Sequence, residues 1–449
     1  MNLMNQVASA MKNVLTTVSD NIAKTTGFMR RRRKLTGAKF VQTLVFGWLS
    51  NPEATYEELA QTAATVGVTV TPQAVEKRFT KEACDCLLGV LLEGVGQVIA
   101  AESQAIPILQ RFSAISIQDS TTITLPKVLA TIWPGSGRCT DDKKPAGLKV
   151  QIRWDWLSGA FTDFHLKAGR VHDRRAEFDN DELPKGSLRL ADLGYFSLEE
   201  LKSLSGGEQA KPLSPQIYWL TRIQAMCAIF DAHGDRKELA KWLEKQDTTQ
   251  VEFPVRLGVK AQLPCRLLAL RISEEQAAKR RRQIRKAAQR KGQTPSKTRL
   301  QLAAWTIFAT NVPDEMLTVS EAITLARVRW QIELLFKLWK SHGQIDEWRS
   351  EKPWRILCEV YAKLLAMVIQ HWILLTGCWH HPSRSLCKAA KTIARHALHM
   401  AAAFAKGNRE RLVDAISTIC RCLESGCRVN RRRKEPATYQ LLLELTDSS

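Results

Sequence analysis

Long apolar runs are missing from this sequence, and a helix that spans a membrane would need one. No stretch of about 18 consecutive apolar residues is evident in the 449-residue chain, which argues against such a helix. The N-terminus lacks an apolar core followed by a small-residue cleavage site, so we expect no signal peptide. Cysteine is sparse and odd in number, eleven residues, as expected for reduced thiols in the cytosol rather than a disulfide framework.

Acidic residues are scarce relative to basic ones. Lys and Arg total 66 against 45 Asp and Glu, which gives a net charge of +21. Such an excess favours a polyanionic partner, either nucleic acid or an anionic membrane surface. Because no segment looks suited to a membrane, nucleic acid is the leading prediction. The chain also lacks a Walker-type glycine loop and an internal repeat, so we expect neither ATP dependence nor a repeat architecture.

The chain is too long for one ordinary compact core, so we expect two to four domains. Residue patterns divide it into five regions: a helical, helix-turn-helix-like DNA-binding domain at 1–110, the first part of an α/β domain at 111–223, a β-rich basic insertion at 224–306, the last strand and a Glu-bearing helix of the α/β domain at 307–350, and a helical C-terminal region at 351–449.

The first region contains signals of a DNA-binding helix pair. The basic run Arg30–Lys34 precedes an apolar helix, and Thr55 and Thr71 have the sequence context of N-caps, with Pro72 at a first helical position. A short helix, a glycine turn and a second helix that ends in Lys-Arg are typical of a helix-turn-helix. An ordinary helical hairpin is the alternative. The candidate DNA-contacting residues are Gln73, Lys77 and Arg78.

Alternating apolar residues predict strands in the central regions. A mixed sheet with helices on both faces follows from their order: Ile115–Asp119, Gly147–Trp156, Phe161–Lys167, Ser187–Asp192, a helix Ser197–Leu204, and Ile217–Ile223. The insertion adds strands at Val251–Val259 and Cys265–Ile272. It also has a basic helix or loop at Lys279–Arg299, which either contacts DNA or is simply solvated. Helices are expected at Glu321–Leu338, Ile356–Leu375 and Ala389–Phe404, after a strand at Thr306–Val312.

Three carboxylates are candidates for metal chemistry. Asp119 and Asp192 each end a predicted strand, with apolar residues at alternate positions before them. Glu333 lies on the predicted helix from Glu321, and its basic neighbours at helical spacing share its face: Arg329, Lys337 and Lys340. Two metal ions held by carboxylates can activate a nucleophile and stabilise a leaving oxygen in phosphodiester chemistry. A turn or cap role is the alternative for either Asp, and a solvated, salt-bridged helix is the alternative for the helix.

These residues carry a family resemblance over about Ser113 to Arg349. The spacing of Arg329, Glu333 and Lys340 resembles the YREK signature of the IS-four family of insertion-sequence DDE transposases, although Ala326 replaces its Tyr. The strings Gln118-Asp119-Ser120-Thr121 and Ala191-Asp192-Leu193-Gly194-Tyr195-Phe196 resemble the motifs around that family's two Asp residues. The resemblance implies a ribonuclease-H-like catalytic fold, interrupted by the insertion and flanked by the helical regions.

The resemblance also implies residue roles. Asp119, Asp192 and Glu333 would hold two Mg²⁺ or Mn²⁺ ions per active site. Arg329 and Lys340 would grip phosphates near a transposon end, with Lys337 adding to this contact, and Ala326 cannot supply the hydrogen bond of the family's Tyr. Trp330 and Trp305 match positions that hold a flipped base, which needs a flat apolar partner. A core role is the alternative for Trp305 and, less favoured, for Trp330.

The implied activity is cut-and-paste transposition. Water attacks the phosphate at the transposon end, the freed 3′-OH forms a hairpin that water reopens, and the released 3′-OH attacks target DNA. The expected partners are terminal inverted repeats, target DNA and a second copy of the chain, in the bacterial cytoplasm at the nucleoid and without a membrane. A structure-specific endonuclease of the same fold and a transposase-derived, non-catalytic DNA-binding regulator are the alternatives.

Overall fold

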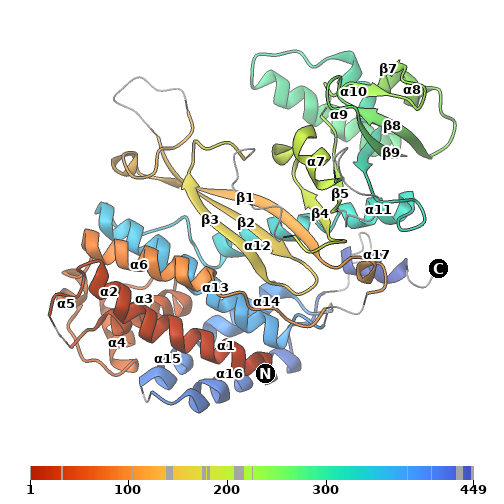
Figure 1. Cartoon of the computed structure of the whole chain (residues 1–449). Helices are drawn as coiled ribbons and strands as arrows, with labels where there is room; N and C mark the ends of the chain where they lie inside the picture. The colour runs from red at the N-terminus through yellow and green to blue at the C-terminus, as the bar shows by residue number, and fades with distance from the viewer. Residues whose placement is uncertain are drawn as a thin grey trace. The chain divides into compact units, whose positions relative to one another are not determined.

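The structure is a computed structural model that divides into two compact units (Figure 1). Unit 1 comprises Met1–Ala105, Ser120–Val171 and Ile332–Tyr439, and unit 2 comprises Ile106–Asp119, His172–Gln331 and Gln440–Ser449. Arg32 and Arg33 of the basic run lie outside the described residues. The structure describes residues 2–31, 34–103, 106–137, 145–173, 178, 183–206, 217–224, 226–381, 383–405, 407–430 and 438–445.

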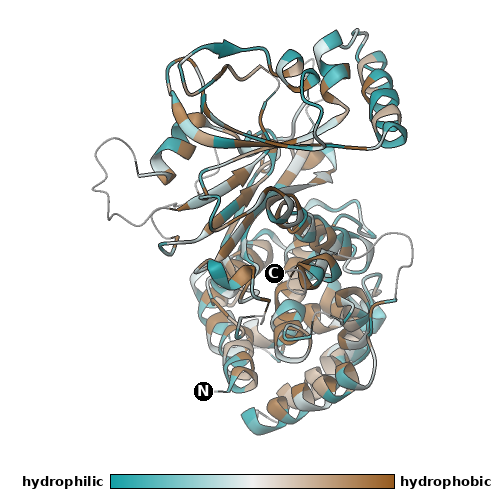
Figure 2. Cartoon of the chain, turned by 90° about the vertical axis from the view of Figure 1, so that its right-hand side faces the viewer, coloured by the Kyte–Doolittle hydropathy of each residue, from teal (hydrophilic) through white to brown (hydrophobic). Residues whose placement is uncertain are grey.

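Unit 1 is mostly helical. Its helices are α1 (Leu3–Asn13), the π-helical turn η1 (Val14–Val18), α2 (Ser19–Thr25), α3 (Gly37–Ser50), α4 (Tyr56–Thr65), α5 (Pro72–Glu76), α6 (Lys81–Val95), the 3₁₀ turn η3 (Lys127–Leu129), most of α12 (Trp330–Ser341), α13 (Pro353–Gly377), α14 (Leu386–Arg395), α15 (Ala397–Ala405) and α16 (Arg409–Ser425). Helix α17 (Thr438–Glu444) follows. Figure 2 shows long hydrophobic (brown) stretches along the helices of the chain.

The predicted N-caps of the first region are present. Thr55 accepts a hydrogen bond from the Glu58 backbone N–H in a capping box, and Thr71 accepts one from the Ala74 N–H, with Pro72 in the first turn. Helix α5 has five residues, so it presents little more than one turn to a ligand.

Helix α13 is the centre of unit 1. It packs against α1, α3, α6, α14 and α16. By length and composition α13 could cross a membrane, but its most apolar 18-residue window is 100% buried inside the protein. The sequence shows no unbroken apolar run here because Arg355, Glu359 and Lys363 interrupt it. The apolar side chains of α13 are therefore part of the protein core.

The strands of unit 1 are β2 (Ala146–Asp155), β3 (Phe161–Ala168) and the second half of β1 (Ile115–Leu125), in the order β3-β2-β1. β2 and β3 form an antiparallel hairpin, and its turn is fixed to α13. The Gly159 carbonyl accepts hydrogen bonds from Trp154 Nε1 at 3.0 Å and from His371 Nε2 at 2.7 Å. Burial lowers the pKa of His371 to about 4, so its ring is neutral near pH 7 and stacks on Phe161 at 4.1 Å.

Unit 2 contains the rest of the sheet. Its elements are η2 (Leu109–Arg111), the first half of β1, β4 (Leu188–Ala191), η7 (Leu193–Tyr195), α7 (Leu198–Leu204), β5 (Tyr218–Thr221), β6 (Ile229–Phe230), β7 (Arg236–Lys237), α8 (Leu239–Glu244), β8 (Gln250–Leu257), β9 (Leu263–Arg271), α9 (Glu274–Gln289), α10 (Lys297–Leu302), β10 (Trp305–Thr310) and α11 (Val319–Ala326). Its core lies between the sheet and α7, around Trp219, Leu257 and Leu267.

The strand order confirms the predicted α/β class with a mixed sheet. In unit 2 the order is β1-β4-β5-β10-β9-β8-β6-β7. β1 and β4 are parallel, as are β4 and β5, whereas β10 is antiparallel to both β5 and β9. Antiparallel strands β2 and β3 before β1, and parallel strands β4 and β5 after it, are the arrangement of the ribonuclease-H-like fold.

Three predicted elements differ from the structure. Asp119 does not end a strand, because β1 continues to Leu125 through Thr121, Thr122 and Ile123, whose branched side chains favour extended backbone. The predicted helix Glu321–Leu338 is two helices, α11 and α12, joined by a turn at Arg327–Arg329. The predicted helix Ala389–Phe404 also divides, into α14 and α15 at His396.

The break between α11 and α12 has no glycine or proline. Trp330 and Gln331 bond through their backbone N–H groups to the carbonyls three residues earlier, at 3.1 and 2.9 Å, so the chain tightens into a 3₁₀-like turn. Val328 is buried inside this turn. Tertiary contacts, rather than a local breaker, set the break.

Gly159→Ala should destabilise unit 1. Gly159 has a φ of 73°, and an added Cβ would lie 2.4 Å from Leu375 Cδ2. Overpacking costs roughly 1–3 kcal/mol and a left-handed non-glycine residue about 1–2 kcal/mol. Gly234→Ala is the matched control, with a φ of 88° and nothing within 4 Å. Urea unfolding followed by tryptophan fluorescence should show the larger loss for Gly159→Ala, and equal losses would contradict this packing.

Candidate active site

Two aspartates are brought together by the pairing of β1 with β4. In this parallel pair Gln118 is opposite Ala191, so the next positions, Asp119 and Asp192, are neighbours. Asp119 lies within β1, whereas Asp192 follows the end of β4 and precedes η7. Their side chains are 15% and 48% exposed. The sheet therefore fixes one carboxylate firmly and leaves the other more open to solvent.

Arg329 lies against both carboxylates. Its Nη1 is 3.2 Å from Asp119 Oδ2 and 3.9 Å from Asp192 Oδ1. The guanidinium reaches them from the turn between α11 and α12, rather than from a helix as the sequence predicts. One protein cation thus offsets part of the negative charge of the two acids, and charge-assisted bonds of this kind are among the stronger ones.

A buried polar chain supports the paired strands. Arg189 Nε donates to Gln118 Oε1 at 2.8 Å, and Arg189 Nη2 pairs with Glu200 Oε1 at 2.9 Å. Gln118 and Arg189 precede the two aspartates in β1 and β4. Sequence analysis missed Arg189. The available signal was an arginine at a buried position of an otherwise apolar strand, which needs an internal partner.

Helix α12 bears the other predicted residues. Glu333 is in its first turn, partly buried, and Lys337 is exposed. Lys340 Nζ donates to the Thr122 carbonyl of β1 at 3.0 Å and lies 3.8 Å from Asp346 Oδ2. Within the described residues, no three His, Cys, Asp or Glu side chains are grouped closely enough to hold a metal ion.

Known proteins match a large part of this chain. Residues 110–369 match the family model described as a transposase DDE domain. The chain is 30% identical over 369 residues to the transposase of insertion sequence element IS231C of Bacillus thuringiensis subsp. berliner, covering 78% of this chain and 75% of the relative. The IS231B transposase of the same source is 29% identical over 369 residues, with the same coverage.

The chain belongs to the DDE transposase family. It is an enzyme, an insertion-sequence DNA transposase that binds DNA and belongs to a metal-dependent class. The transposase of IS1151 of Clostridium perfringens is 27% identical over 378 residues, covering 80% of this chain and 78% of the relative. A solved piggyBac transposase synaptic complex with hairpin DNA has a TM-score of 0.46 and 10% identity, covering 91% of this chain and 82% of that one.

Trp305, the first of the two predicted base-holding residues, is buried in unit 2. It is 8% exposed and packs with Leu243, Val251 and Ala269. The Arg271 guanidinium lies over its ring, 4.7 Å from the centroid. Stacking of a base on this transposase residue would require its neighbours to move.

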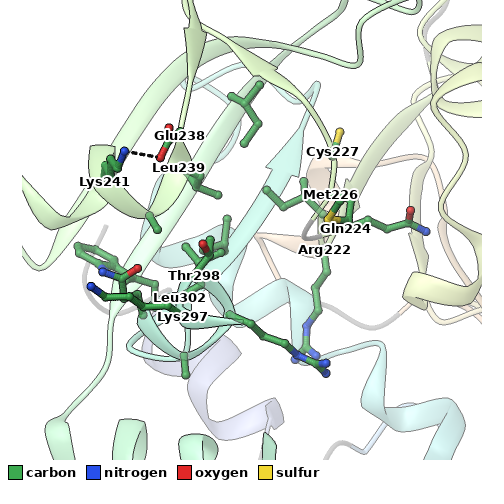
Figure 3. Close-up of a pocket in the computed structure, with 18 of the residues that line it drawn as sticks. Arg222, Gln224, Met226, Cys227, Glu238, Leu239, Lys241, Lys297, Thr298 and Leu302 are labelled. Atoms are coloured by element: carbon green, nitrogen blue, oxygen red, sulfur yellow. Dashed lines mark ion pairs between the residues drawn. The ribbon is translucent and has the colours of Figure 1, made fainter. Parts of the chain in front are cut away.

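A basic pocket adjoins Trp305 in unit 2 (Figure 3). Its volume is about 930 Å³, and it lies between the segment after β5, α8, α9 and α10. Figure 3 shows Arg222 and Met226 on one side and the α10 residues on the other. Burial, and then the charge of Arg222, lowers the pKa of Arg280, so two guanidiniums repel each other here. Sequence analysis did not single out either arginine.

A second basic groove lies among the N-terminal helices of the transposase. Its volume is about 720 Å³, and Arg30, Arg31 and Lys34 line it together with Lys77 and Arg78. The Arg78 guanidinium is held by the Leu35 carbonyl at 3.4 Å and lies 5.5 Å from the centroid of the Phe28 ring. Gln73 is exposed on α5 but does not line the groove.

Trp330 and Trp339 of α12 should respond differently to truncation. Trp330 is 53% exposed, whereas Trp339 is 1% exposed and packs against Phe161 and Phe164. Trp339→Ala should therefore cost about 3–5 kcal/mol of unfolding free energy, and Trp330→Ala within about 0.5 kcal/mol. Chemical unfolding of both variants measures this. A large loss for Trp330→Ala would show that its ring is a core residue and not available to DNA.

Proposed function

We propose that Asp119, Asp192 and Glu333 hold two divalent ions, Mg²⁺ or Mn²⁺, in the active site of an IS-four-family transposase of the YREK group. The main support is the strand register that makes Asp119 and Asp192 neighbours, with one cation, Arg329, already at both carboxylates. Oxygen ligands of this kind suit Mg²⁺, which keeps several waters and needs few carboxylates.

Two contacts of its sequence neighbours support the place of Glu333 in this set. Arg329, four residues before it, contacts Asp119 within unit 2. Lys340, seven residues after it, donates to the Thr122 carbonyl of β1 within unit 1. Glu333 lies between these two cations in the chain, as the Glu of the YREK signature does.

The chemistry divides between the ions and the chain. When bound, the ions would stabilise the attacking and leaving oxygens of in-line displacement at phosphorus. The three carboxylates would fix their positions. Arg329 and Lys340 would bind phosphates of the transposon end, with Lys337 exposed beside them, because guanidinium and ammonium groups complement phosphate. Trp330, exposed near Glu333, would stack on a flipped base during hairpin formation.

The basic surfaces support the DNA partners of the cut-and-paste reaction. The N-terminal groove with Lys77 and Arg78, and exposed Gln73 beside it, would bind the terminal inverted repeats. The pocket beside Trp305 would hold DNA near the cleaved end. Target DNA would be joined by the same active site, and two copies of the chain would pair two ends, in the bacterial cytoplasm at the nucleoid.

Removing a carboxylate should abolish cleavage and spare DNA binding. Asp119→Asn, Asp192→Asn and Glu333→Gln keep the side-chain shape. Each should lower cleavage of DNA that carries the element's ends by a hundredfold or more, on the order expected for loss of metal stabilisation. Gel assays of cleavage and end binding measure both.

The control is Asp314→Asn, an exposed acid before α11, which should cleave normally. If one of the three variants cleaves at nearly the wild-type rate, its residue has been wrongly assigned.

Arg329 should compete with divalent ions in the DNA-free protein. Arg329→Gln removes the cation between Asp119 and Asp192. Mn²⁺ affinity without DNA should then rise on the order of tenfold, since close charges interact by several kcal/mol at partly buried sites. Electron paramagnetic resonance of free and bound Mn²⁺ measures this affinity.

Lys337→Gln removes the same charge from an exposed position of α12 and should change Mn²⁺ affinity about twofold at most. Equal affinities for wild type and Arg329→Gln would disprove the competition.

A further inference from the structure

Helix α13 contains a ladder of three buried charges that the proposed chemistry does not use. Arg355, Glu359 and Lys363 are spaced four residues apart on one face, and their side chains are 4%, 2% and 2% exposed. Arg355 Nη1 lies 2.8 Å from Glu359 Oε2, and Lys363 Nζ lies 2.8 Å from Glu359 Oε1. Two cations thus share one anion, in a core where charges are costly.

One end of the ladder holds the segment that follows α12. Lys363 Nζ donates to the carbonyl oxygens of Gln344 at 3.2 Å and Glu347 at 2.8 Å. Gln344 has a left-handed φ of 45°. At Gly343 an added Cβ would lie 2.5 Å from Met367 Sδ. The chain just after α12 therefore packs closely against α13. Two hydrogen bonds from the Lys363 ammonium group fix its position.

The other end of the ladder lies among the N-terminal helices. The Arg355 guanidinium is 4.4 Å from the centroid of Phe79, 4.6 Å from that of Trp48 and 5.3 Å from that of Tyr56. These rings belong to α3, α4 and the segment after α5. Cation–π contacts are strongest for desolvated cations, so Arg355 is held on both sides, by the rings and by Glu359.

Stability alone gives no reason for these charges. Replacing buried ion pairs by apolar side chains of similar volume is often neutral or stabilising. An apolar side chain at position 363, however, could not donate to the two carbonyls. Lys363 therefore fixes the position of the chain directly after α12.

We propose that Lys363 is a positioning residue for the active site, held in place by Glu359 and Arg355. Glu333 lies in the first turn of α12 and Ser341 at its end, eight residues or about 12 Å away along a rigid helix. Displacement of that end shifts or rotates Glu333 against the ion it binds. This inference rests on the proposed role of Glu333 as a metal ligand.

Lys363→Met tests the inference in the full-length protein. The substitution leaves the neutral pair Arg355–Glu359 behind, so no uncompensated charge is buried. Mn²⁺ affinity, measured by electron paramagnetic resonance, should fall at least fivefold. Binding of end DNA, measured by fluorescence anisotropy, should stay within twofold of wild type, because no DNA-facing residue changes.

Lys39→Met is the matched control. Lys39 also donates to a backbone carbonyl, that of Val66 at 2.6 Å, but at the end of α4. It should leave Mn²⁺ affinity unchanged. Gly343→Ala displaces the end of α12 without touching a charge, and should weaken Mn²⁺ binding as Lys363→Met does. If Lys363→Met does not fold, Gly343→Ala decides the question alone.

The outcomes separate this inference from the proposed function. Glu333→Gln should weaken Mn²⁺ binding; if it does not, Glu333 is not a ligand and the proposed function fails. If Glu333→Gln loses affinity while folded Lys363→Met and Gly343→Ala bind Mn²⁺ like wild type, only the positioning role is overturned. A parallel fall of Mn²⁺ affinity, DNA affinity and melting temperature in Lys363→Met would also overturn it, as general destabilisation.

Discussion

The backbone hydrogen bonds between β1 and β4 determine where this transposase concentrates negative charge. Because side chains alternate along a strand, a slip of one residue would send the side chain of Asp119 to the opposite face of the sheet. The Gln118–Arg189 bond joins the two strands from buried positions, one residue before Asp119 and three before Asp192, so it opposes such a slip. Two acids held side by side repel each other, and Arg329 relieves that repulsion.

Helix α13 has to satisfy two conflicting demands. As the central helix of unit 1 it must be apolar on nearly every side, which gives it the length and hydropathy of a membrane span. Yet it also has three ionised side chains, which a core tolerates only when they are paired. Glu359 pairs with both cations, and the remaining donors of Lys363 reach backbone carbonyls. The charges therefore join α13 to the segment after α12 and to the aromatic rings around Arg355.

Local patterns in the sequence were sufficient for much of this fold. Alternating residues located β1 to β5 and β8 to β10, and Thr55 and Thr71 marked helix starts, because these signals depend on a few neighbouring residues. The spacing of Arg329, Glu333 and Lys340 could be recognised in the sequence for the same reason. Their assigned roles, and the division of the chain into five regions, stay predictions.

What the sequence did not reveal depends on contacts between distant segments. The turn at Arg327–Arg329 contains good helix formers, and the partners that favour it, such as Asp119, lie some 200 residues away. The sequence is compatible with Trp305 either as a residue that stacks on a ligand or as a core residue. Only the structure shows the Arg271 guanidinium over its ring. Arg189 and Lys363 look like interruptions of apolar segments, and only tertiary structure supplies their partners.

The pairing of β5 with β10 has a consequence for how this family of enzymes can vary. The segment between β5 and β10 begins after Thr221 and ends at β10, where Ala309 is paired with Thr221 itself. The strands at the two ends of this segment, β5 and β10, are thus neighbours in the sheet. Loop-closure entropy grows only slowly with loop length, so segments of very different size can be accommodated there at small cost to folding. Changes in the length of this segment can therefore leave the register of β1 with β4, which makes Asp119 and Asp192 neighbours, unaltered.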